Sequence, residues 1–100
     1  MSQHEVVQRI IYRALQNLNA ELPPNAQGAV TEDTLLLGEH SLLDSLSLIS
    51  VIIDVETAVQ DELGRTVSLT DDRAMSHQPS PYVDVRALLT YLLLLLSEQN

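Results

Sequence analysis

The helix that decides the fold lies in residues 44–64, which read DSLSLISVIIDVETAVQDELG. After Ser45 the apolar residues recur at helical spacing on one face, and polar residues recur on the opposite face. The apolar stripe consists of Leu48, Ile52, Val55, Val59 and Leu63. The polar stripe consists of Ser47, Ser50, Asp54, Thr57 and Asp61. Because glycine fits the left-handed position that closes a helix, the pattern predicts an amphipathic helix from Ser45 to Gly64.

A helix and a long loop are predicted before Ser45. Ser2 and Glu5 have the spacing of a capping box, so we expect a first helix over roughly residues 3–20. Its apolar stripe consists of Val7, Ile10, Ile11, Ala14 and Leu18. Pro23 and Pro24 stop this helix, and residues 21–44 show no sustained period. They predict a long loop that packs in places through Val30, Leu35, Leu36 and Leu37.

Two more helices are predicted after Gly64. Thr70 has the character of a cap and Asp71 and Asp72 that of an acidic first turn, so we expect a short helix that runs through Met75. Asp84 is the predicted cap of a last helix that runs through Leu96. The fold class is therefore all-α, with one domain over residues 1–100: a four-helix bundle with a long first loop and a short third helix.

Composition and charge restrict the functions that this chain can have. The 100 residues fit one domain, and the hydrophobic share of 45% is almost wholly aliphatic, with no Phe, no Trp and three Tyr. Fourteen acidic residues against five arginines give a formal charge of −9. Nucleic acid and anionic membranes are therefore repelled, and basic protein partners are attracted. Without Cys the chain has no disulfide, no thiolate zinc site and no catalytic thiol of its own.

Location and metal binding are also limited by the sequence. The apolar pattern of the N-terminus is interrupted by Glu5, Arg9 and Arg13, so it does not resemble a secretion signal, and we expect a cytoplasmic protein. The most apolar run, around Leu92–Leu96, is much shorter than the roughly 20 residues of a membrane span. The three histidines (His4, His40 and His77) are well separated, so we expect them to be solvated rather than to bind a metal.

A serine at the predicted loop-to-helix junction is the candidate site. Asp44 and Ser45 lie where the long loop meets the amphipathic helix. A hydroxyl at a helix start lies beside unpaired backbone N–H groups and the positive end of the helix dipole, and this environment suits a phosphate ester. The alternative is that Ser45 only caps the helix, as serine often does, or that Asp44 does so in its place.

The triplet Asp44-Ser45-Leu46, between an apolar loop and an apolar-patterned helix, resembles the attachment motif of acyl and peptidyl carrier proteins. The order of the four predicted helices is similar to that family over most of the chain. The resemblance implies that Ser45 accepts 4′-phosphopantetheine from coenzyme A, through a phosphopantetheinyl transferase and its magnesium ion, and that Asp44 is the acidic residue before it. It also implies a carrier, not an enzyme, that acyl- or aminoacyl-loading and -processing enzymes use as their substrate.

The same resemblance points to a partner-binding face on the second helix. Leu46 matches the apolar side chain that the family uses beside the arm. Ile49 and Ile53 lie on a flank of this helix, where we expect them to complete the core, although an exposed docking strip is the alternative. Fatty-acid carriers have a face rich in Asp and Glu, whereas this chain has Ser47 and Ser50 before Asp54. We therefore expect a carrier for specialised biosynthesis, such as that of a polyketide or another secondary metabolite, rather than for housekeeping fatty-acid synthesis.

Other functions remain as alternatives. The chief one is an acidic helical adaptor that binds a protein partner and carries no prosthetic group. Asp54, Glu56, Asp61 and Glu62 are expected to form a solvated face rather than paired catalytic carboxylates, because nothing indicates an apolar pocket that separates their pKa values. We expect a monomer. The run Leu92–Leu96 is apolar around the whole helix, so it belongs either to the core or to a surface for a partner or a second copy.

Overall fold

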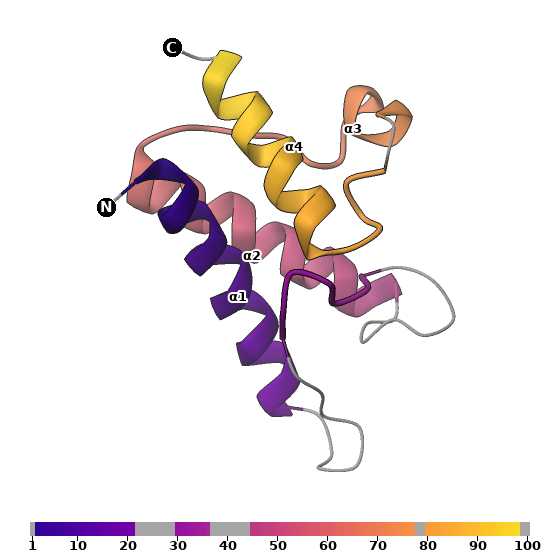
Figure 1. Cartoon of the computed structure of the whole chain (residues 1–100). Helices are drawn as coiled ribbons and strands as arrows, with labels where there is room; N and C mark the ends of the chain where they lie inside the picture. The colour runs from indigo at the N-terminus through magenta and orange to yellow at the C-terminus, as the bar shows by residue number, and fades with distance from the viewer. Residues whose placement is uncertain (1, 22–29, 37–44, 78–79, 99–100) are drawn as a thin grey trace.

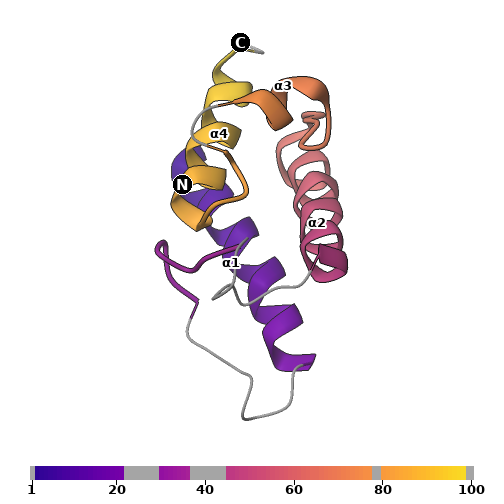
Figure 2. The ribbon, with the colours of Figure 1, turned by 90° about the vertical axis from the view of Figure 1, so that its right-hand side faces the viewer.

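The computed structural model describes residues 2–21, 30–36, 45–77 and 80–98. Its helices, in chain order, are α1 (Gln3–Glu21), α2 (Ser45–Leu63), α3 (Asp72–Ser76) and α4 (Val85–Glu98). Figure 1 shows α1 running beside both α2 and α4, and Figure 2 shows α2 and α4 on opposite sides with α3 near their upper ends. The all-α class and the small-bundle architecture that the sequence predicts are confirmed. Within the described ranges no strand is present, apart from an isolated bridge between Leu35 and Asp84.

Side-chain caps define the ends of these helices. Ser2 Oγ accepts the backbone N–H of Glu5 at 3.1 Å, and so begins α1 as predicted. Asp71 caps α3 by accepting the N–H of Ala74 at 2.9 Å, and Asp84 caps α4 by accepting that of Ala87 at 2.8 Å. Gly64 ends α2 with a φ of +65°, the left-handed conformation that glycine adopts without steric cost. The helix limits therefore agree with the predicted ones to within two or three residues.

The core is almost entirely aliphatic, as the composition predicts. It is formed by the stripe of each long helix together with Leu36, Val67, Leu69 and Ala74 from the connecting segments and α3. In α1 the buried residues include Leu15, which the sequence analysis did not select, whereas Leu18 is only partly buried. In α2 the predicted stripe is buried, with Leu63 half-buried at its end, and Val51 joins it. Tyr91 of α4 is the one fully buried aromatic side chain among the described residues.

The described segment of the first loop, residues 30–36, packs against the start of α4. The backbone of Leu36 donates to Val83 O at 3.0 Å, and Val85 donates to Thr34 O at 3.1 Å. Leu36 is buried and Val30 is partly buried, which confirms two of the predicted anchors. Leu35 is an exception, because its side chain is exposed, and Leu37 lies outside the described residues. These contacts tie residues 34–36 to the start of α4.

The short helix α3 is held against α4 by a few side-chain contacts, and the backbones of the two helices do not pack closely. Arg73 Nη1 donates to Glu98 Oε1 at 2.6 Å, which links α3 to the end of α4. The ring of His77, just after α3, meets the ring of Tyr91 edge to face, with centroids 4.7 Å apart. Solvation was expected for His77, and this was wrong: it is half-buried and packs against an aromatic ring. His77 directly follows α3, and its imidazole packs on the ring of Tyr91 in α4.

Candidate functional site

The second helix begins at Ser45, as the sequence predicts. Asp44 lies outside the described residues. The first N–H groups of any α-helix have no partner within the helix, and the helix dipole places partial positive charge at the same end. A group carried by Ser45 is thus attached at the end of α2 that favours a phosphate.

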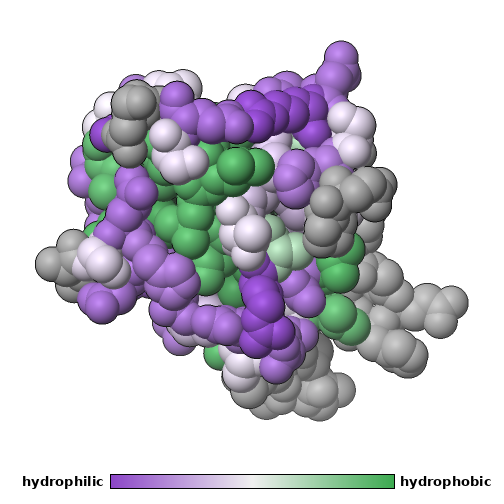
Figure 3. Space-filling view, turned by 45° about the horizontal axis from the view of Figure 1, so that its top comes forward, coloured by the Kyte–Doolittle hydropathy of each residue, from purple (hydrophilic) through white to green (hydrophobic). Residues whose placement is uncertain are grey.

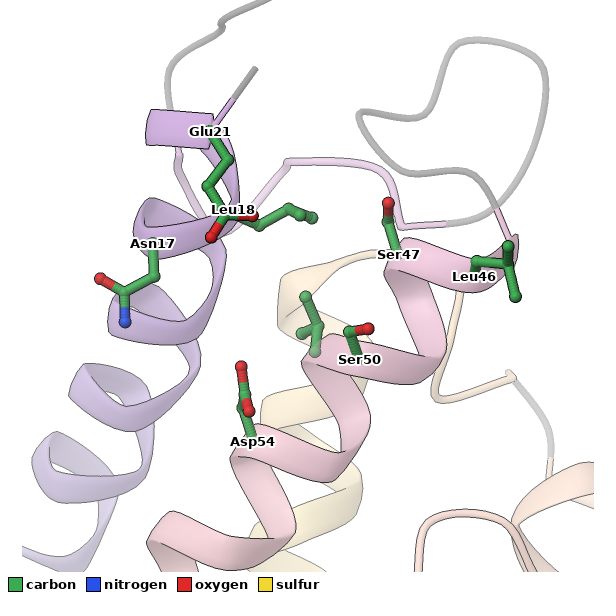
Figure 4. Close-up of a pocket in the computed structure, with 8 residues that line it drawn as sticks. Asn17, Leu18, Glu21, Leu46, Ser47, Ser50 and Asp54 are labelled. Carbon is green, nitrogen blue, oxygen red and sulfur yellow. The ribbon is translucent and has the colours of Figure 1, made fainter.

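A groove opens beside this helix start, between the last turns of α1 and the first turns of α2 (Figure 4). Its volume is about 400 Å³. It is lined by all four residues predicted to bind partners, together with residues of α1 and one core residue: Leu46, Ser47, Ser50 and Asp54, with Asn17, Leu18, Glu21 and Val51. The structure therefore brings the predicted partner-binding residues together around one surface. Its polar part comes from hydroxyl, amide and carboxylate side chains.

The opposite flank of α2 carries an exposed apolar strip, which we define as Leu46, Ile49 and Ile53. Their exposed fractions are 78%, 50% and 54%, respectively. The prediction that Ile49 and Ile53 complete the core is therefore wrong. At 100° per residue both isoleucines lie closer to Leu46 than to the buried Leu48 and Val55, and no described element covers that flank. Leu46 belongs to both surfaces, and Figure 4 shows its side chain pointing away from α1.

Apolar side chains are exposed at other places as well. Leu35, Val83 and Leu94 are each exposed to about the same degree. Figure 3 shows a broad apolar area in green on one face of the molecule, bordered by hydrophilic side chains in purple. The apolar strip differs from these places because it starts beside the predicted attachment point and follows one helix for two turns.

The acidic residues of α2 have separate structural roles. Asp54 and Asp61 are exposed, as expected for a solvated face, and both line a second groove of about 290 Å³ between α1 and α2. Glu62 forms ion pairs with Arg9 and, at 3.8 Å, with Arg13. Glu56 is half-buried, and its carboxylate accepts the backbone N–H of Leu69 at 2.7 Å. Glu56 was expected to be solvated; instead it holds the segment between α2 and α3.

The leucine-rich run of α4 is mainly core. Leu92 and Leu96 are fully buried, Leu93 and Leu95 are half-buried, and Leu94 is 38% exposed. Of the two interpretations of this run, the structure favours the core for most of its residues. Only the side chain of Leu94 leaves a substantial apolar area of the run open to a partner.

Two tyrosines with buried hydroxyl groups were missed by the sequence analysis. The hydroxyl oxygens of Tyr82 and Tyr91 are both inaccessible to solvent, and neither has a hydrogen-bond partner among the described residues. Tyr91 as a whole is only 1% exposed. The available signal was a polar aromatic residue within a leucine-rich helix, in a chain that contains no Phe at all.

Burial makes these two side chains resist ionisation. It is the largest cause that raises the pKa of both Tyr82 and Tyr91 above the ordinary value of 10.0. When folding raises a pKa, the contribution to stability is complete below the unfolded pKa and is lost as the pH rises through the folded value. We therefore expect the free energy of unfolding to fall above pH 10.0, measured by chemical denaturation at increasing pH. A Tyr82→Phe/Tyr91→Phe chain with the same alkaline loss would contradict this assignment.

The described residues form neither a metal site nor a membrane-spanning helix. Among the described residues no group of three His, Asp or Glu side chains is close enough to hold a metal ion. His4 is exposed, and His40 lies outside the described residues. Over the ranges that the structure describes, none of the helices combines the length and the apolar character needed to cross a bilayer.

Comparison of this chain with protein-family models, with curated proteins and with solved structures finds no match. The function is therefore inferred from the start of α2 and the two surfaces beside it.

Proposed function

We propose that this chain is an acyl carrier protein. It carries acyl or aminoacyl groups as thioesters on a 4′-phosphopantetheine arm attached to Ser45, and it presents them to the enzymes of a specialised biosynthesis. The observation that supports this most is the start of α2 at Ser45, with a groove on one flank and the apolar strip on the other. The order of the four helices, with a long loop before α2 and a short α3, is consistent with the family resemblance.

The residues at the start of α2 fit the arm. The phosphate of the arm would lie at the helix N-terminus, where backbone N–H groups and the dipole favour negative charge. In the transfer reaction the hydroxyl oxygen of Ser45 forms a bond with the phosphorus next to the pantetheine part of coenzyme A. The pyrophosphate bond breaks, the nucleotide part of coenzyme A leaves, and the transferase takes up the hydroxyl proton. When bound, the group supplies a thiol that holds the cargo as a thioester.

The surfaces beside Ser45 have the properties of a partner-binding site. The strip of Leu46, Ile49 and Ile53 offers apolar contacts that a partner can bury. The groove on the other flank adds Ser47, Ser50 and the carboxylate of Asp54 as a polar border. Together with the formal charge of −9, these features fit partner enzymes with an apolar patch surrounded by basic side chains.

The chief test is the intact mass of the chain after incubation with coenzyme A, magnesium and a broad-specificity phosphopantetheinyl transferase. We expect the mass to increase by one phosphopantetheinyl group. An unchanged mass in a chain shown to be folded would overturn the carrier proposal. The apolar strip would then favour the adaptor, which binds a protein partner through the same surface without a prosthetic group.

The apolar strip should matter for partners and not for folding. We expect Leu46→Ala to change the free energy of unfolding by less than about 0.5 kcal/mol, because the side chain is largely exposed. The same change should lower kcat/KM of the transferase about tenfold, which corresponds to the loss of a contact worth more than 1 kcal/mol at an interface.

The matched control is Leu94→Ala, which removes the same atoms from a partly exposed leucine on α4. It should leave kcat/KM of the transferase unchanged. Equal effects of the two substitutions on kcat/KM would show that the strip is not part of the interface.

A further inference from the structure

The apolar strip on α2 lies in a segment of the chain without charge. The formal charge of the whole chain is −9, but no charged residue occurs between Asp44 and Asp54. Within this segment Leu46, Ile49 and Ile53 are at least half exposed, and none of the described elements covers them. Two copies of an acidic protein repel each other least where neither copy carries a charge. This segment can therefore face a second copy of the same chain.

The leucine-rich run of α4 is also uncharged, but it offers a smaller apolar surface. From Ala87 to Ser97 this helix has no charged residue. Of its leucines, Leu94 is 38% exposed, and the others are buried or half-buried. Of the two uncharged helix segments, the start of α2 therefore has the larger apolar area left to cover.

The strip has a shape that suits two-fold symmetry. Leu46, Ile49 and Ile53 fall within a sector of about 60° around α2 and extend over about 10 Å of its length. In a two-fold dimer the same surface of both copies meets, so each residue pair across the contact occurs twice. When two such helices pack antiparallel about an axis near Ile49 and Ser50, Leu46 of each copy lies against Ile53 of the other. One contact then covers both strips.

We propose that a second copy of this chain binds the apolar strip, with the two α2 helices antiparallel around Ile49. This inference goes beyond the carrier function and does not depend on it. Three partly exposed side chains cover much less than the roughly 800 Å² that each partner contributes to a standard interface, so the dimer is weak, with a dissociation constant on the order of 100 µM. At lower concentrations the chain is the monomer that the sequence predicts.

The dimer has a consequence for the surface beside the predicted attachment point. Leu46 follows Ser45 directly, and its side chain points away from α1, on the flank that the second copy covers (Figure 4). An enzyme that binds the strip must therefore displace the second copy. In a concentrated solution the dimer protects the exposed apolar side chains until such an enzyme arrives.

Salt distinguishes this dimer from a complex with a basic protein. Two copies with a formal charge of −9 each repel one another, and dissolved ions screen this repulsion. Sodium chloride should therefore strengthen the dimer. The same ions weaken the attraction between this acidic chain and a basic enzyme, so the two kinds of association respond to salt in opposite directions.

Sedimentation equilibrium of the unmodified chain tests the proposal. We expect the average mass to rise from the 11.1 kDa of one chain toward twice that value as the protein concentration is raised, and to rise more readily at high salt. Ile49→Asp places two like charges at the axis and should weaken the dimer about tenfold or more. Leu94→Asp, which changes the net charge equally on α4, should weaken it far less. Circular dichroism verifies that both variants are folded.

A chemical cross-link tests the antiparallel arrangement. The chain has no Cys, so an introduced cysteine is its only thiol. The two-fold axis brings Ser50 close to Ser50 of the other copy, whereas Gln60, exposed on the same face of α2, lies about 30 Å from its counterpart. We expect a short bismaleimide to link the Ser50→Cys chain into a covalent dimer and to leave the Gln60→Cys chain monomeric.

Three results would overturn this proposal. The first is a mass that stays at that of one chain at every protein and salt concentration. The second is an equal effect of Ile49→Asp and Leu94→Asp on the dimer, and the third is equal linking of the two cysteine variants. None of these results bears on the carrier function, which the gain of a phosphopantetheinyl group tests separately.

Discussion

Ser45→Ala is expected to remain folded and to gain no mass with coenzyme A, magnesium and the transferase. The substitution removes the one oxygen that the proposed reaction requires. At the start of a helix, replacing a serine with alanine costs about 1 kcal/mol, whereas a domain of this size has a free energy of unfolding of about 5–15 kcal/mol. The loss of modification would therefore be chemical and not a result of unfolding, which circular dichroism of the variant would verify.

Neighbouring serines provide the matched control for this prediction. Ser47 and Ser50 lie on the first two turns of α2 and line the groove beside its start. Ser47→Ala and Ser50→Ala should both still gain one phosphopantetheinyl group. A Ser45→Ala chain that gains the same mass as the parent would show that another residue is the acceptor.

Leu92→Ala is expected to have the largest effect on stability. Leu92 is completely buried in α4, at the interface with the rest of the core. Removal of a fully buried leucine side chain leaves a cavity and lowers the free energy of unfolding by about 2–5 kcal/mol. A domain of this size has a free energy of unfolding of only about 5–15 kcal/mol, so this loss is a large fraction of its stability. Urea denaturation followed by circular dichroism measures the change.

Leu94→Ala is the control for this substitution as well, because it removes the same atoms two residues away. Leu94 is 38% exposed, so its truncation should cost less than about 1 kcal/mol. If both variants lost the same stability, the division of the leucine-rich run into core and surface would be wrong.

The helices could be predicted well because their signals are local. Gly64 ends α2, and Asp84 caps α4, for reasons that depend only on the residues next to them. The start of α2 at Ser45 was predicted in the same way, from the change in pattern at the junction. The burial of the apolar stripe of α2 could be predicted from the helical spacing of its residues, because a helix in a small bundle turns its apolar face toward the core.

The flanks of α2 could not be predicted, because their burial depends on distant elements. Ile49 and Ile53 are as apolar as the buried Ile52, but α3 has five residues and no described element covers their flank. The contact of His77 with Tyr91 and the role of Glu56 have the same origin, since each depends on how the chain returns after Gly64. Periodicity identifies the faces of a helix, and only tertiary packing determines which of them are covered.

The ion pairs of the surface have a consequence for the speed of partner encounter. Arg9, Arg13, Arg73 and Arg86 each lie beside a carboxylate, so most of the positive charge of the chain is locally compensated. The formal charge of −9 then acts on an approaching basic protein as a net attraction. Long-range attraction of this kind accelerates association, and added electrolyte screens it beyond a Debye length of about 8 Å at physiological ionic strength. Association with a basic enzyme should thus slow steeply as sodium chloride is added, while the apolar strip retains the complex once it has formed.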